Sequence, residues 1–81
     1  MKAIVNVGLK KGVLDDQGKA INHALGTLGF KDLISDVRVG KQIIIELNSK
    51  DKESAKAEVT KMCEKLLANT VIEDYSVEIV G

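Results

Sequence analysis

Apolar and polar residues alternate in four stretches of the chain, and apolar residues recur at helical spacing in two others. Alternation places successive side chains on opposite faces of a β-strand, whereas a period of about 3.6 places apolar side chains along one stripe of an α-helix. The alternating stretches are residues 2–9, 36–39, 42–47 and 74–79, and the helical stretches follow Asp15 and Asp51. This pattern predicts the order βαββαβ.

Each predicted strand has a more apolar face, which should point into a core. The inward positions are Ala3, Val5, Val7, Leu9, Ile43, Ile45, Leu47, Tyr75, Val77 and Ile79. Ile4 and Ile44 point the other way, among Asn6, Gln42 and Glu46. We therefore expect two isoleucines on a sheet face that is otherwise polar.

The predicted helices begin and end at recognisable residues. Asp15 is a favourable N-cap for the first helix, and Gly29 suits a left-handed position at its end. Asn48, Ser49 and Asp51 offer caps for the second helix. Gly40 followed by Lys41 has the composition of a tight type II′ turn between two strands.

Right-handed crossovers applied to this order predict an α+β fold of the two-layer ferredoxin-like type. It would contain a four-stranded antiparallel sheet with both helices on one face, and residues 1–81 would form a single domain. The first and third strands would be neighbours, which places Ile4 beside Ile44 on the uncovered face. Because an uncovered apolar patch marks an interaction site, we expect this face to mediate self-association.

The charge balance and the cysteine content exclude several classes of function. Lys and Arg total 12, as do Asp and Glu, so the net charge is zero and provides no field that attracts nucleic acid or an anionic membrane. No stretch approaches the roughly 20 apolar residues of a membrane span. A single cysteine cannot form an internal disulfide, which favours a reduced, intracellular setting.

Few residues are candidates for chemistry, and each has a simpler explanation. The lone His23 lies on the polar side of its helix, and Cys63 lies at the edge of an apolar stripe. Asp15 and Asp16 are explained by helix capping. Lys10 and its neighbours lack the glycine pattern of a phosphate-binding loop. We therefore predict neither catalytic residues nor a metal site, and we interpret the chain as an accessory subunit that oligomerises.

Four motifs resemble the PurS family, the small subunit of phosphoribosylformylglycinamidine synthase. They are Gly12 to Gly18 (GVLDDQG), Ala24 to Phe30 (ALGTLGF), Val37 to Lys41 (VRVGK) and Leu66 to Tyr75 (LLANTVIEDY). Each motif is weak alone, but the four lie in register along nearly the whole chain.

The resemblance implies a role in de novo purine biosynthesis, in the cytoplasm. The family's complex converts formylglycinamide ribonucleotide to formylglycinamidine ribonucleotide with glutamine and ATP. A large PurL-type synthase subunit uses ATP and Mg²⁺, and a PurQ-type glutaminase subunit releases ammonia. The resemblance implies that the small subunit bridges the two, supports ammonia transfer, carries no cofactor or catalytic residue, and forms homodimers or dimers of dimers.

The resemblance also indicates candidate partner contacts. These are Asp15, Gln17 and Gly18 at the first loop–helix junction, and Arg38, Gly40 and Lys41 at the predicted hairpin. The chain departs from the family where Asp16 and Thr70 replace common prolines. Loss of a proline that fits its position removes about 0.4–1 kcal/mol of stabilisation, so we expect lower local rigidity and an unchanged fold.

Other classes of protein share this order of elements. A small-molecule-sensing regulatory domain remains an alternative to the synthase subunit. An RNA-binding sheet would need stacking aromatics, which residues 42–47 lack. A metal-transfer domain would need a Cys-x-x-Cys pair, which a chain with one cysteine does not contain.

Overall fold

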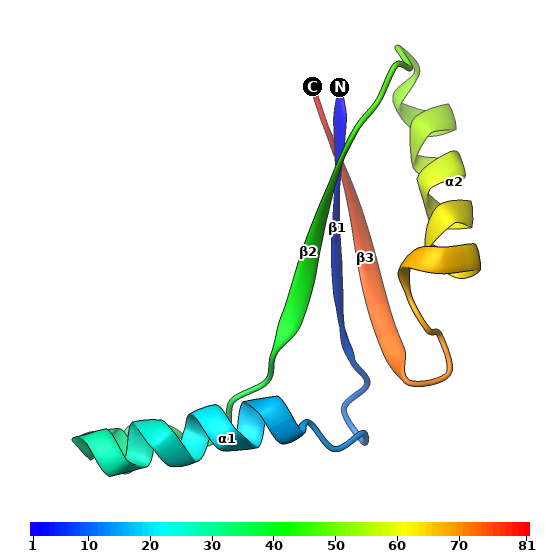
Figure 1. Cartoon of the computed structure of the whole chain (residues 1–81). Helices are drawn as coiled ribbons and strands as arrows, with labels where there is room; N and C mark the ends of the chain where they lie inside the picture. The colour runs from blue at the N-terminus through cyan, green and yellow to red at the C-terminus, as the bar shows by residue number, and fades with distance from the viewer.

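The computed structural model describes all 81 residues. Three strands and two helices follow one another along the chain (Figure 1). Their bounds are β1 (Lys2–Leu9), α1 (Asp16–Leu25), β2 (Gly40–Glu46), α2 (Lys52–Met62) and β3 (Glu73–Val80). Each helix ends in a wider π-helical turn, which spans Gly26–Phe30 after α1 and Cys63–Leu67 after α2.

The strands form one antiparallel sheet in the order β2-β1-β3. Ala3 of β1 lies opposite Ile45 of β2 and Ile79 of β3, so the inward residues of all three strands share one face. Ile4 lies opposite Ile44 on the other face. The predicted strand faces and the predicted Ile4–Ile44 pairing are therefore confirmed.

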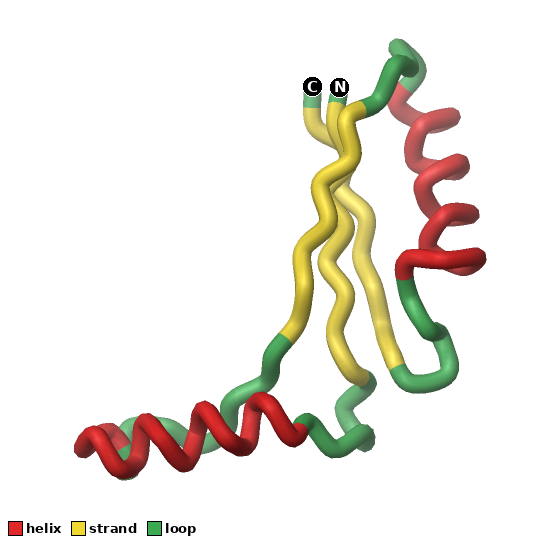
Figure 2. The backbone as a smooth tube through the Cα atoms, viewed as in Figure 1, coloured by secondary structure: helices red, strands yellow, loops and turns green.

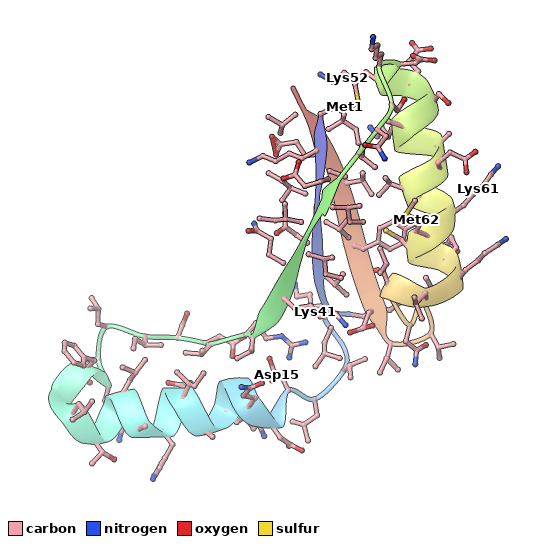
Figure 3. The ribbon with its side chains drawn as sticks, turned by 45° about the horizontal axis from the view of Figure 1, so that its top comes forward. Met1, Asp15, Lys41, Lys52, Lys61 and Met62 are labelled. Atoms are coloured by element: carbon pink, nitrogen blue, oxygen red, sulfur yellow. The ribbon has the colours of Figure 1, made fainter.

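Helix α2 packs against the inward face and completes the core (Figure 3). Ala55 and Val59 of α2 and Cys63 of the turn that follows are buried, at the spacing of four residues that defines one helix face. They belong to one core cluster with Ala3, Val5 and Val7 of β1 and Ile79 of β3. The core is small, because only eight hydrophobic residues are buried.

The sheet has three strands, so the prediction of four was wrong. Residues 36–39 lie outside the sheet and run directly into β2, and the backbone N–H of Val39 donates to the carboxylate of Asp15. Gly40 is the first residue of β2 rather than part of a turn. A type II′ turn needs a positive φ at Gly40, but only Gly29 and Gly81 have one.

Only one helix covers the sheet, so the prediction that both do was also wrong. Helix α1 runs outward from the end of the sheet, and the chain returns beside it to β2 (Figures 1 and 2). The radius of gyration is 16.2 Å, whereas a compact chain of this length has about 12 Å. We call residues 16–39, the outgoing helix and the returning segment, the arm.

The predicted helix ends are found in the structure. Asp15 caps α1, Asp51 caps α2, and Gly29 has φ 102° at the end of the turn that follows α1. Gly29 stands there because side chains with a Cβ rarely adopt a positive φ. Neither helix has the length and apolar character needed to cross a bilayer.

Candidate functional site

The base of the arm is held by Asp15. The residue is extended, with φ −110° and ψ 93°, and is 5% exposed. Its Oδ1 accepts a hydrogen bond from the N–H of Gly18 at 2.8 Å, which caps α1. Its Oδ2 accepts one from the N–H of Val39 at 2.7 Å. One carboxylate therefore joins the beginning of α1 to the residue that precedes β2 (Figure 3).

The surroundings of Asp15 favour its ionised form. The N–H of Val39 lowers the pKa of the carboxyl most, the N–H of Gly18 lowers it next, and the nearby Arg38 charge adds to the effect. Burial opposes these contributions without overcoming them, so the pKa lies below its ordinary value. The junction is therefore built around a carboxylate rather than a carboxylic acid.

Arg38 makes a second tie across the same junction. Its guanidinium donates to the carbonyl oxygen of Lys10 at 3.0 Å, which links the returning segment to the loop after β1. The N–H of Lys10 donates to the carbonyl of Ile72 at 2.8 Å, and its ammonium lies 3.5 Å from Asp74. The loop is thus connected to both the arm and the beginning of β3.

Gly18 allows the two sides of the arm to approach. It is buried, and a Cβ at this position would fall against the carbonyl oxygen of Val37 and within 2.9 Å of the Asp15 carboxylate. A residue with a side chain would therefore push the returning segment away from α1. Gly18 has a packing role that the sequence alone did not reveal.

Gln17, Gly40 and Lys41 stand at the surface of the junction. They line a shallow depression of about 210 Å³ together with Glu73 and residues at the end of β1. All three are exposed. The structure therefore brings the six predicted contact residues to one place, from two segments that lie far apart in sequence.

The six residues divide into two groups. Asp15, Gly18 and Arg38 bond to or pack against the chain itself, whereas Gln17, Gly40 and Lys41 line the exposed depression. Sequence reasoning missed Val39 and Glu73. Nothing in the sequence shows that the N–H of Val39 would meet Asp15. The contribution of Glu73 to the depression follows from β3 lying beside β1.

The sheet face opposite α2 carries Ile4 and Ile44. Ile44 is 54% exposed, and Ile4 is partly buried beside it. On the same face the amide of Gln42 donates to Asn6 at 3.1 Å. The mixed character of this face, two isoleucines among polar groups, matches the prediction from the alternating pattern.

The other candidate chemical groups are placed as follows. His23 is exposed beside a hollow of about 660 Å³ between α1 and the returning segment, together with Lys19 and Lys31. Cys63 is fully buried, and burial raises the pKa of its thiol, which makes it a poor nucleophile. Nowhere in the structure do three or more His, Cys, Asp or Glu side chains come together in a group that could hold a metal ion.

The fold and this junction define a small α+β domain with a helical arm fixed outward from its sheet. Residues 2–81 match the family model described as PurS, phosphoribosylformylglycinamidine (FGAM) synthase. The chain belongs to the PurS family of FGAM synthase subunits.

Curated relatives and solved structures agree. The PurS subunit of Methanocaldococcus jannaschii is 45% identical over 78 residues, 96% of this chain and 93% of that protein. The Bacillus subtilis PurS subunit is 46% identical over 78 residues, 96% of this chain and 90% of that protein. A B. subtilis PurS structure superposes with a TM-score of 0.86 at 45% identity, covering 99% of this chain and 98% of that one.

A chain in a structure of PurLQS from Thermotoga maritima is also similar. The TM-score is 0.82 at 32% identity, over 98% of this chain and 95% of that one. The extended shape of the single chain is therefore shared with PurS chains, including one from an assembly of several subunits.

Proposed function

We propose that this chain is the small subunit that bridges the synthase and glutaminase subunits of FGAM synthase and supports ammonia transfer between them. The complex would convert formylglycinamide ribonucleotide to formylglycinamidine ribonucleotide with glutamine and ATP. The observation that carries the proposal is the similarity to a chain of the T. maritima PurLQS structure over nearly the full length of both chains.

In this proposal the chain contributes surface rather than chemistry. The PurL-type subunit would use ATP and Mg²⁺, and the PurQ-type subunit would hydrolyse glutamine. The junction suits a docking role because its backbone is fixed by Asp15 and Arg38 while Gln17 and Lys41 project from it. A fixed surface loses little conformational freedom when a partner binds.

We further propose that the chain self-associates, as a homodimer or a dimer of dimers. The exposed Ile44 and its neighbour Ile4 support one self-association face. The extended shape supports a larger interface, because a small core gains stability when another chain covers exposed apolar surface.

Reconstitution with PurL-type and PurQ-type subunits tests the bridging role. Activity is measured with glutamine and, separately, with ammonium salt as the nitrogen donor. We expect omission of this chain to lower the glutamine-dependent rate much more than the ammonia-dependent rate, because free ammonia needs no bridge. Equal glutamine-dependent rates with and without the chain would refute the proposal.

Charge reversal tests the junction as the contact surface. We expect Lys41→Glu and Arg38→Glu to weaken co-purification with the two larger subunits by roughly tenfold or more. Lys61→Glu, on the exposed side of α2, is the matched control. Lys41→Glu separates contact from folding, because Lys41 is exposed whereas Arg38 also bonds to Lys10. An intact complex with both variants would remove the junction from the interface.

A further inference from the structure

A hollow of about 660 Å³ lies within the arm, between α1 with its following turn and the segment that returns beside it (Figure 2). Lys19, His23 and Gly26 belong to one wall, and Lys31 and Ile34 belong to the other. Pockets that bind small molecules have volumes of about 300–1,000 Å³, so the hollow has room for such a ligand. Neither the capping of α1 nor the junction at the base of the arm uses these residues.

The lining of the hollow is polar, and its lysines are its only fully charged groups. Of the seven lining residues only Ile34 is hydrophobic, and none is an aspartate or a glutamate. Lys19 and His23 are four residues apart, which places both on one face of α1. Lys31 adds a second ammonium from the other wall. The whole chain has equal numbers of acidic and basic residues, so this local excess of positive charge does not follow from composition.

The two ammonium groups of the hollow have no anionic partner in the chain. Both ion pairs of the chain lie outside the arm. Lys19 and Lys31 therefore keep their charges unneutralised, although Asp16 and Asp32 lie close to them in sequence. Two unpaired cations that line one hollow create a positive potential, which attracts an anion.

Gly26 keeps the hollow open at a cost in helix stability. Its backbone is helical, with φ −61° and ψ −42°, so no positive φ requires a glycine there. A Cβ at this position would meet only the Cβ of Lys31, at 3.8 Å, which is an ordinary contact. Glycine is less favourable than alanine in helical backbone, and such departures from local preference are expected at functional sites. A large side chain at Gly26 would occupy the hollow beside Lys31.

The polar groups of the hollow suit a phosphate. Each lysine ammonium has three donors and binds phosphate as a point charge, and the amide of Asn22 adds a neutral donor. The hydroxyl of Thr27 already donates to the carbonyl of His23 at 3.2 Å, so it contributes no donor. A phosphate fills only a small part of 660 Å³, and the remaining space can hold the organic part of a small molecule.

We propose that the hollow of the arm binds a small phosphate monoester, with its phosphate group held by Lys19, His23 and Lys31. All three side chains are exposed, so a small molecule reaches them without rearrangement of the junction. The inference goes beyond the bridging role and does not depend on it, because every residue of the hollow belongs to this chain.

Nuclear magnetic resonance titration of the full chain tests the site. Ribose 5-phosphate is the probe, and ribose at the same ionic strength is the control. We expect the probe to shift the backbone amide signals of residues 19–31 saturably, with a dissociation constant of roughly 1 mM or tighter. Ribose should leave these signals in place. Shifts that do not saturate, or that ribose reproduces, would overturn the proposal.

Variants of the lining separate a specific site from general attraction to positive charge. We expect Lys19→Ala and Lys31→Ala each to raise the dissociation constant by roughly tenfold, because each removes a charge-assisted hydrogen bond. Lys56→Ala removes an exposed charge from α2 and should leave the constant unchanged. Gly26→Leu fills the hollow, keeps every charge and should abolish saturable binding without altering the circular dichroism spectrum. Equal affinities for Lys56→Ala and the two lysine variants of the lining would overturn the proposal.

Two further probes test the class of ligand. Inorganic phosphate that binds as tightly as the sugar phosphate would overturn the assignment to a monoester, because the organic part would then contribute nothing. A hexaglutamate peptide that binds more tightly than the sugar phosphate would also overturn it, because the hollow would then suit an acidic protein segment. The glutamine-dependent rate of the reconstituted complex measures the bridging role separately, so failure of one proposal does not imply failure of the other.

Discussion

Oδ2 of Asp15 accepts a hydrogen bond from the backbone N–H of Val39 at 2.7 Å, across 24 residues of sequence. The same carboxylate caps α1 through Gly18. An N-cap is ordinarily a local feature, but here its second oxygen fixes where the chain returns from the arm. The direction of the arm relative to the sheet therefore depends on this side chain together with Arg38, which bonds to Lys10 across the same junction.

Removal of this carboxylate should destabilise the chain. Asp15→Ala loses both hydrogen bonds and leaves the N–H groups of Gly18 and Val39 without their acceptor. We expect the melting temperature to fall by roughly 5–10 °C, as for loss of a strong cap in a domain of this size. The neighbouring exposed Asp16→Ala is the control, and thermal circular dichroism is the measurement. Equal melting temperatures for the two variants would contradict the role of Asp15.

The same group predicts a dependence of stability on acid pH. The pKa of Asp15 lies below its ordinary 3.8 in the folded chain, so the unfolded chain takes up the proton first as pH falls. The stabilisation is complete above about pH 4 and is lost as pH falls through the lowered pKa. Urea denaturation between pH 2 and 6 should show a shallower decline for Asp15→Asn than for the wild type. Parallel pH dependences for Asp15→Asn and the wild type would contradict this contribution of the Asp15 carboxylate.

Replacement by alanine should change the stability of the fold in opposite directions at two glycines of the arm. Gly18→Ala places a methyl group against the carbonyl of Val37, and overpacking of this kind destabilises by about 1–3 kcal/mol. Gly26→Ala meets only Lys31, at 3.8 Å, in helical backbone. It should stabilise by about 0.5–1 kcal/mol because alanine favours the helix. Chemical denaturation measures both, and a stabilising Gly18→Ala would refute the close approach.

The hydrogen bond between Tyr75 and Glu64 predicts that the fold loses stability at strongly alkaline pH. The phenol donates to Oε2 of Glu64 at 2.6 Å, and this bond, with burial, raises the pKa of Tyr75 to about 12 from 10.0. The bond stabilises the fold fully below pH 10, and that contribution is lost as pH rises through about 12. We expect Tyr75→Phe to be less stable than the wild type at pH 8 and to show a flatter decline above pH 10. Ultraviolet titration of the single tyrosine should give the raised pKa directly.

The strand faces and helix caps could be predicted because they are local properties. Alternation in β1 places Ala3, Val5 and Val7 on one side whatever the strand pairs with, and the pattern identified this correctly. Asp15 and Gly29 are suited to helix ends by their own side chains and backbone preferences. The six candidate contact residues came from motifs, which depend on sequence alone.

The fourth strand and the position of α1 could not be predicted in the same way. Val37 and Val39 alternate with polar residues as strand residues do, but pairing with residues 42–47 needs a turn at Gly40, and the chain continues through Gly40 as strand β2. The N–H of Val39 met a carboxylate instead. Likewise, the apolar stripe of α1 predicts that something packs against it without specifying which surface.

The sequence by itself determined which segments are strands and helices, which face of each is apolar, and which family the motifs resemble. Only the tertiary structure decided that residues 36–39 stay outside the sheet and that α1 extends away from it. The physical reason is that side-chain periodicity acts within a few residues, whereas these outcomes depend on bonds across 24 and 28 residues, from Asp15 to Val39 and from Arg38 to Lys10.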